Sequence, residues 1–169
     1  MPTATVDGIP TRYEVSGDGP PLLMFSPGGF DSTLENWTRH GLYPRIELMA
    51  RLRQRFTCVA FDRRESGRSG GRLERIRWDH WVAQGAGLLD HLGIERAHLI
   101  GACVGCSTAA AFAVAHPSRA DRMVLYSPAG GPRYRMTQLD RFGAHAAYVA
   151  AEGLAAVVEL ARSGTAGFA

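Results

Sequence analysis

The chain contains no lysine, so arginine supplies all 19 of its basic side chains. Without lysine, a Schiff-base nucleophile is excluded, and so is a Walker-type phosphate loop, whose lysine reaches the phosphates. The 16 acidic residues leave a net charge of only +3, and the arginines are scattered along the sequence. We therefore expect no nucleic-acid partner, although the pI is near 9.0.

Long apolar runs are also absent, and no segment approaches the length needed to cross a bilayer. The N-terminal stretch MPTATVDGIPTRYEV lacks the basic start and apolar run of a secretion signal. The cysteines are Cys58, Cys103 and Cys106, an odd number that favours reduced thiols over a disulfide framework. We predict a cytoplasmic protein with no membrane partner, in which any cysteine chemistry is catalytic.

The sequence does contain short apolar runs that alternate with segments whose apolar residues have helical spacing, and its length is typical of one domain. Two extended runs, TATVDG and TRYEVSG, open the chain and predict an antiparallel β-meander with the apolar run that follows them. Parallel strands are predicted at 21–27, 56–62, 96–102 and 122–128. Helices are predicted at 42–55, 78–94 and 105–117. This order predicts the α/β class, with a mostly parallel sheet covered by helices on both faces.

From about Pro132 the pattern changes, because helical periodicity continues without a further strand. We divide the chain into a sheet part at 1–132 and a second part at 133–169. The second part is predicted to form two helices outside the sheet.

Cys103 lies between two glycines in GACVGCS, where a predicted strand becomes a predicted helix. The sequence from Gly101 to Gly105 is a G-x-C-x-G form of the nucleophile elbow, a strained turn that exposes the central side chain. Glycines are needed on either side because larger residues would collide where strand and helix pass closely. The start of a helix favours the thiolate, so Cys103 is the candidate catalytic nucleophile.

Two other interpretations of this cysteine remain open. Cys103 and Cys106 form a C-x-x-C at a helix start, the arrangement of a thiol redox protein. A buried, inert Cys103 would instead suit a non-catalytic binding module, and Cys58, inside an apolar strand, is expected to be packing.

The chain resembles the α/β-hydrolase superfamily in stretches that span residues 5 to 132. The stretches are YEVSGDGPPLLMFSPGGF, FDRRESGRSGG, GACVGCS and HPSRADRMVLYSPAGGP. The resemblance implies a small-molecule acyl substrate, no metal or organic cofactor, and two backbone donors for the oxyanion. One donor maps onto Gly28, Gly29 or Phe30, and the other is the amide of Val104. Cysteine in place of the usual serine is known in the dienelactone-hydrolase branch.

The sequence departs from the family at two places that bear on the substrate. Ser26 or Pro27 stands where the family usually has a histidine, and Glu65 replaces the first glycine of the D-x-R-G-x-G-x-S stretch. Hydrolysis of an ester, lactone or thioester is the leading expectation. Acyl transfer and hydrolysis of a carbon–carbon bond use the same machinery and stay open. Asp62, Arg63 and Arg64 are expected to tie down their loop, and Arg64 could alternatively hold substrate.

The resemblance also implies a catalytic acid and a histidine after later strands, and this chain ends before those strands. The segment 133–169 fits the start of a lid. His80, His91, His98 and His116 are expected in surface or capping positions. His40 and His145 are the weaker candidates for a base. We therefore expect a second polypeptide segment to complete the sheet, with a homo-oligomer as the alternative assembly.

Overall fold

The computed structural model of the protein describes residues 2–163. It divides into two compact units, with the boundary between Ala129 and Gly130. The sequence placed a boundary at 132/133, and the last positions of its second part, 164–169, lie outside the described residues.

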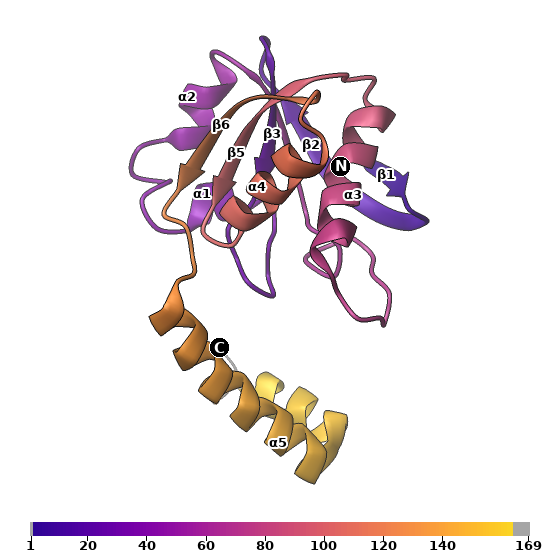
Figure 1. Cartoon of the computed structure of the whole chain (residues 1–169), viewed down its shortest axis with the longest axis vertical. Helices are drawn as coiled ribbons and strands as arrows, with labels where there is room; N and C mark the ends of the chain where they lie inside the picture. Colours follow the sequence, from indigo (N-terminus) through magenta and orange to yellow (C-terminus); the bar gives the residue numbers. More distant parts are fainter. Residues whose placement is uncertain (1, 164–169) are drawn as a thin grey trace. The chain divides into compact units, whose positions relative to one another are not determined.

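Six strands of the first unit form one sheet in the order β1-β2-β4-β3-β5-β6 (Figure 1). Their bounds are β1 Thr3–Val6, β2 Ile9–Ser16, β3 Pro21–Phe25, β4 Thr57–Phe61, β5 Ala97–Ala102 and β6 Ala120–Tyr126. β1 and β2 are antiparallel, as are β2 and β4, whereas β4, β3, β5 and β6 are parallel neighbours. The predicted α/β class and its four parallel strands are confirmed.

The meander expected at the N-terminus stops after β2, because β3 does not pair with β2. β2 pairs with the later strand β4, with Tyr13 opposite Phe61, and β3 lies on the far side of β4. The turn between β2 and β3 passes over the start of β4. A Cβ atom at Gly17 would lie 2.2 Å from the carbonyl oxygen of Phe56, so only glycine allows this close crossing.

Alternate residues of the central strands face two different helical layers, as a period of two requires. On one face, Leu23, Val59 and Leu99 pack with residues of α3 (Trp78–His91) and α4 (Gly105–Ala115). On the other face, Met24 and Ile100 pack with residues of α1 (Asn36–Arg39) and α2 (Leu48–Arg53). The three predicted layers are therefore present in the first unit (Figure 1).

The helix predicted at 42–55 is much shorter than expected. Residues before Leu48 form turns, and Glu47 has a left-handed backbone with φ 50°. Pro44 lacks an N–H for a helical ladder, and the spacing of Leu42 and Ile46 was misleading because both side chains are exposed. Tyr43 is the residue that is buried, against the ring of Trp37 at 5.4 Å.

The second unit contains α5 (Pro132–Arg162), which is broken at Gly153, where φ is 80° and ψ is 168°. It therefore consists of two consecutive helices, as predicted. None of the helices in the described residues combines the length and the apolar character that a bilayer-spanning helix needs.

Candidate active site

Cys103 occupies a sharp turn between a strand and a helix. β5 ends at Ala102, Cys103 has a left-handed backbone with φ 53°, and α4 begins at Gly105. Two backbone hydrogen bonds hold this turn to the end of β6 and the residues that follow it. The N–H of Cys103 donates to the carbonyl of Tyr126 at 3.1 Å, and the N–H of Ala129 donates to the carbonyl of Cys103 at 3.3 Å. A side chain in this conformation costs energy, which the surrounding contacts offset.

The two glycines beside Cys103 are required by close backbone contacts. A Cβ atom at Gly101 would lie 2.5 Å from the carbonyl oxygen of Gly105, and one at Gly105 would lie 2.1 Å from that of Phe25. The second contact presses the start of α4 against the end of β3. This places the elbow beside the loop that follows β3, which carries the predicted oxyanion donors.

That loop is held in place through its carbonyl groups. Side chains donate to the carbonyls of Ser26, Pro27, Gly29, Phe30 and Asp31. The donors are Ser32 (3.0 Å to Ser26), Asn36 (2.8 Å to Pro27 and 2.6 Å to Asp31), Arg63 (to Gly29) and Ser66 (2.9 Å to Phe30). No pattern in the sequence singled out Ser32 or Asn36 for this task. Since its carbonyls are bound, the loop has a defined shape before any substrate arrives.

Of the predicted oxyanion residues, only Gly28 lines a cleft together with Cys103 among the described residues. Gly28 lines the same cleft as Cys103 and has φ 114°, a conformation that favours glycine. Gly29 and Phe30 follow it in the loop, with the Phe30 side chain 78% exposed. Val104 starts the first turn of α4, and its N–H has no partner among residues 2–163.

A cleft of about 370 Å³ opens above Cys103 in the first unit. Besides Cys103, it is lined by Pro27, Gly28, His40, Gly41, Leu42, Tyr43, Tyr126 and Ser127. Tyr43 and Tyr126 pack together with ring centroids 5.8 Å apart. Burial raises the pKa of Tyr43 to about 12, so its phenol stays protonated and can donate a hydrogen bond in this cleft. No pattern in the sequence indicated that either tyrosine would line this cleft.

The three cysteines are free thiols in different surroundings. Cys103 is half-buried, whereas Cys106 is buried and its Sγ contacts the carbonyls of Gly101 (3.1 Å) and Tyr126 (3.3 Å). Burial raises the pKa of Cys106 and of Cys58, which disfavours their thiolates. Of the three, only Cys103 lines the cleft.

The histidines are distributed over the molecule. His40 lines the cleft with Cys103, and His145 belongs to the second unit, on α5. The remaining four contact residues away from the elbow: His80 approaches Glu74, His91 contacts Tyr13, His98 contacts Asp121, and His116 packs on Phe112. Among the described residues, no group of three or more His, Cys, Asp or Glu side chains could hold a metal ion.

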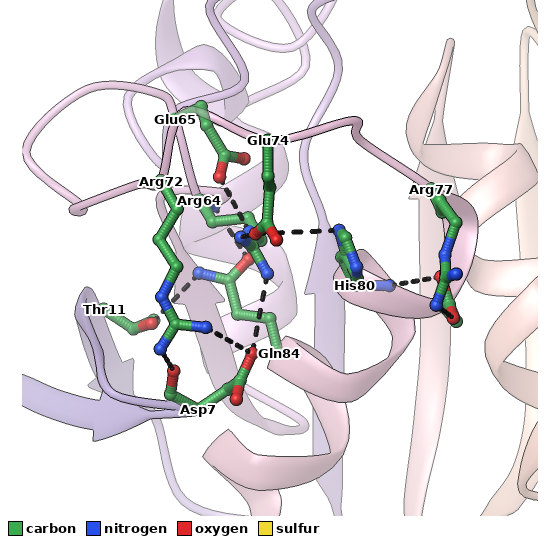
Figure 2. Close-up of polar contacts among 10 residues, drawn as sticks. Asp7, Thr11, Arg64, Glu65, Arg72, Glu74, Arg77, His80 and Gln84 are labelled. Carbon is green, nitrogen blue, oxygen red and sulfur yellow. Dashed lines mark hydrogen bonds and ion pairs between the residues drawn. The ribbon is translucent and has the colours of Figure 1, made fainter.

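The loop after β4 is fixed by buried charges, as expected for Asp62 and Arg64. Asp62 is fully buried and accepts from the Arg12 guanidinium at 3.0 Å and from the N–H of Leu34 at 2.9 Å. Figure 2 shows the Arg64 guanidinium between Glu65 (2.7 Å), Glu74 and Asp7. Because Arg64 is only 2% exposed and faces three carboxylates, it is not available to hold substrate.

Comparison with known proteins agrees with this geometry. The sequence profile of the α/β hydrolase fold family matches residues 21–165, which is most of the chain. The chain belongs to this family. One similar protein is the 2-hydroxymuconate semialdehyde hydrolase of Pseudomonas sp. (strain CF600). It is 35% identical over 125 residues, which cover 73% of this chain and 41% of that enzyme.

A second relative is the dihydrolipoyllysine-residue acetyltransferase component of the acetoin cleaving system of Cupriavidus necator. It is 35% identical over 127 residues, which cover 75% of this chain and 32% of the relative. Among solved structures, a meta-cleavage product hydrolase from Pseudomonas fluorescens IP01 is 30% identical with a TM-score of 0.66, covering 77% of this chain and 46% of that one. The chain thus spans less than half the length of these relatives.

Proposed function

We propose that this chain supplies the nucleophile and the oxyanion site of an α/β hydrolase. In this proposal the Cys103 thiolate attacks an electrophilic carbonyl carbon and a carbon–sulfur bond forms. The bond between that carbon and the leaving group then breaks, and the leaving group takes up the proton that the thiol had released, which gives an acyl-enzyme. The observation that carries the proposal is the left-handed Cys103 at the elbow, facing the cleft. An inert core cysteine would not require this strained position.

The oxyanion would be stabilised by the amide of Val104 and by an amide of the loop at Gly28, Gly29 or Phe30. Support comes from the free N–H of Val104 in the described residues and from the fixed loop carbonyls. Preorganised amides of this kind stabilise the charge that develops on the carbonyl oxygen during attack. Gly28 is the loop residue with the strongest support, because it shares the cleft with Cys103.

We propose that a carboxylate and a histidine come from a polypeptide segment beyond these 169 residues. The relatives are more than twice as long as their matched regions, and the side chains of β6 from Met123 to Tyr126 are more than 40% exposed. An exposed apolar strand at a sheet edge is normally paired or covered. Within the chain, His40 is the alternative base because it lines the cleft.

The substrate class is a carbonyl compound with a cleavable ester, lactone, thioester or carbon–carbon bond. Hydrolysis of a carbon–carbon bond is supported by two of the similar proteins, a 2-hydroxymuconate semialdehyde hydrolase and a meta-cleavage product hydrolase. The competing proposal is a thiol redox protein using Cys103 and Cys106. It is disfavoured by the buried, hydrogen-bonded thiol of Cys106.

Burst kinetics with p-nitrophenyl acetate test the proposal. We expect the 169-residue chain to release about one equivalent of p-nitrophenol and then stop, since a general base typically contributes about 10² to 10⁴-fold. Cys103→Ala should abolish the burst, whereas the matched variant Cys106→Ser should retain it. Loss of the burst in both variants, together with a disulfide between Cys103 and Cys106, would support the redox function. Sustained turnover would place the base within this chain.

A further inference from the structure

Arg63 and Arg64 are neighbours in sequence but lie in opposite electrostatic settings. Arg64 faces carboxylates of Glu65, Glu74 and Asp7. Arg63 has no carboxylate within ion-pair distance among the residues that the structure describes. Its charge is partly removed from water, and this burial lowers the pKa of Arg63, while the more distant charge of Glu65 acts in the opposite direction. A partly desolvated guanidinium that forms no ion pair favours an anion beside it.

The position of Arg63 connects it to the candidate active site. Its guanidinium carbon lies 4.2 Å from the ring centroid of Trp81 on α3, which is a cation–π contact. One terminal nitrogen donates to the carbonyl of Gly29 in the oxyanion loop. Its Nε is buried and has no hydrogen-bond partner among the described residues.

Two further buried polar atoms have no partner within residues 2–163, and their residues line one small cavity together with Arg63. These are Oγ of Ser26, a residue only 5% exposed, and Nε1 of Trp81. The cavity measures about 10 Å³ and is lined by Ser26, Arg63, Trp81, Gly105 and Thr108, among others. Arg63 Nε and Trp81 Nε1 can only donate, so they require an acceptor. The space suits about one oxygen atom and is too small for a whole phosphate or sulfate.

We propose that Ser26, Arg63 and Trp81 form a site for one oxygen of a carboxylate carried by the substrate. The proposal deepens the proposed function and rests on it. Ser26 precedes the oxyanion loop and Gly105 belongs to the elbow, so the cavity borders both parts of the candidate active site. A carboxylate bound there would orient an acidic substrate whose carbonyl carbon faces Cys103. The chain would thus select acyl compounds that carry a second, negatively charged group.

The test compares acylation of the chain by matched pairs of activated esters. The p-nitrophenyl half-esters of glutaric, adipic and pimelic acid are paired with the neutral p-nitrophenyl esters of pentanoic, hexanoic and heptanoic acid. For at least one length we expect the charged ester to react faster than its neutral partner, corrected for spontaneous hydrolysis. Arg63→Gln should reduce this preference by about tenfold, because a charge-assisted hydrogen bond is lost. Its rate with neutral esters should fall less than its rate with charged esters, because both lose the Arg63 contact to the Gly29 carbonyl and only the charged esters also lose the carboxylate contact.

Two variants control for charge and for folding. Arg55→Gln removes an exposed arginine that precedes β4, and it should keep the full preference. Arg63→Lys keeps a positive charge without the planar donor edge and should restore part of the preference. An unchanged preference in Arg63→Gln, or no preference in the unmodified chain, would overturn the proposal.

A binding measurement separates this proposal from the proposed function. If no ester acylates the chain, the proposed function fails, and the thermal midpoint with added adipate then tests the site alone. Adipate should raise the midpoint of the unmodified chain and of Arg55→Gln, but not that of Arg63→Gln. An equal rise with chloride or phosphate would indicate a site for any small anion and would overturn the assignment to a substrate carboxylate.

Discussion

At the scale of single residues, several residues with side chains adopt left-handed backbone near the candidate active site, and Cys103 and Glu65 are two of them. Cys103 has φ 53° and Glu65 has φ 62°. The first could be anticipated from the G-x-C-x-G spacing. The second could be anticipated only from the family pattern, in which a glycine usually stands where this chain has Glu65. The side chain is retained because its carboxylate contacts Arg64 at 2.7 Å.

Substitutions at Glu65 should separate backbone strain from the ion pair. Glu65→Ala and Glu65→Gly both lose the contact with Arg64, but only glycine adopts φ 62° freely. We expect the glycine variant to be more stable than the alanine variant by about 1 kcal/mol. Urea unfolding of the two variants checks this difference, and equal stabilities would show that the turn is not strained.

The Arg12 cluster is a second residue-scale feature, and it predicts a dependence of stability on pH. The hydrogen bond from Arg12 to Glu35, at 2.5 Å, is the main cause that lowers the pKa of Glu35 below its ordinary value of 4.5. A carboxyl with a lowered pKa in the folded state adds stability above pH 4.5. That stability is lost as the pH falls through the folded-state pKa.

Glu35→Gln should therefore be less stable than the unmodified chain at pH 7, by about 1 kcal/mol for this partly exposed pair. The difference should shrink steadily as the pH falls below 4.5. Glu47→Gln, at an exposed carboxylate with no ion pair in the described residues, is the matched control and should change little. The measurement is the free energy of unfolding of each variant across the pH range. A difference between Glu35→Gln and the unmodified chain that does not change with pH would contradict this role of Glu35.

At the scale of secondary-structure elements, the sequence predicted the parallel strands because each is a short, continuous apolar run. It did not predict that β4 separates β2 from β3, since partner choice depends on a turn crossing at Gly17 and not on periodicity. The helix predicted at 42–55 was too long for a similar reason. Leu42 and Ile46 match helical spacing, but Pro44 and the left-handed Glu47 delay the helix until Leu48.

The packing of α4 on β3 gives an element-scale prediction. Gly105→Ala should destabilise the protein by roughly 1 to 3 kcal/mol, because its Cβ would lie 2.1 Å from the carbonyl oxygen of Phe25. Gly29→Ala is the control, since a Cβ at Gly29 meets nothing within 4 Å. It should leave the free energy of unfolding nearly unchanged. Equal losses in the two variants would mean that the elbow tolerates a side chain at Gly105.

At the scale of the whole molecule, the turn at Cys103 and the loop after β3 could be located from the sequence because each lies within a short stretch. The cleft could not, because His40, Tyr43 and Tyr126 come from separate segments that only the folded sheet brings together. The same applies to Arg63, whose lack of a carboxylate partner depends on where Glu65 and Glu74 point. A short motif indicates a candidate nucleophile, whereas the lining of the cleft depends on contacts between distant residues.

The mass of proteolytic peptides after reaction with p-nitrophenyl acetate tests the central claim most directly. We predict a single acetyl group on the peptide that contains Cys103, with Cys58 and Cys106 unmodified because burial disfavours their thiolates. The label should be absent in Cys103→Ala and present in Cys106→Ser. An acetyl group on Cys106 or His40 in place of Cys103, or ester cleavage that persists in Cys103→Ala, would contradict the assignment of Cys103 as the nucleophile.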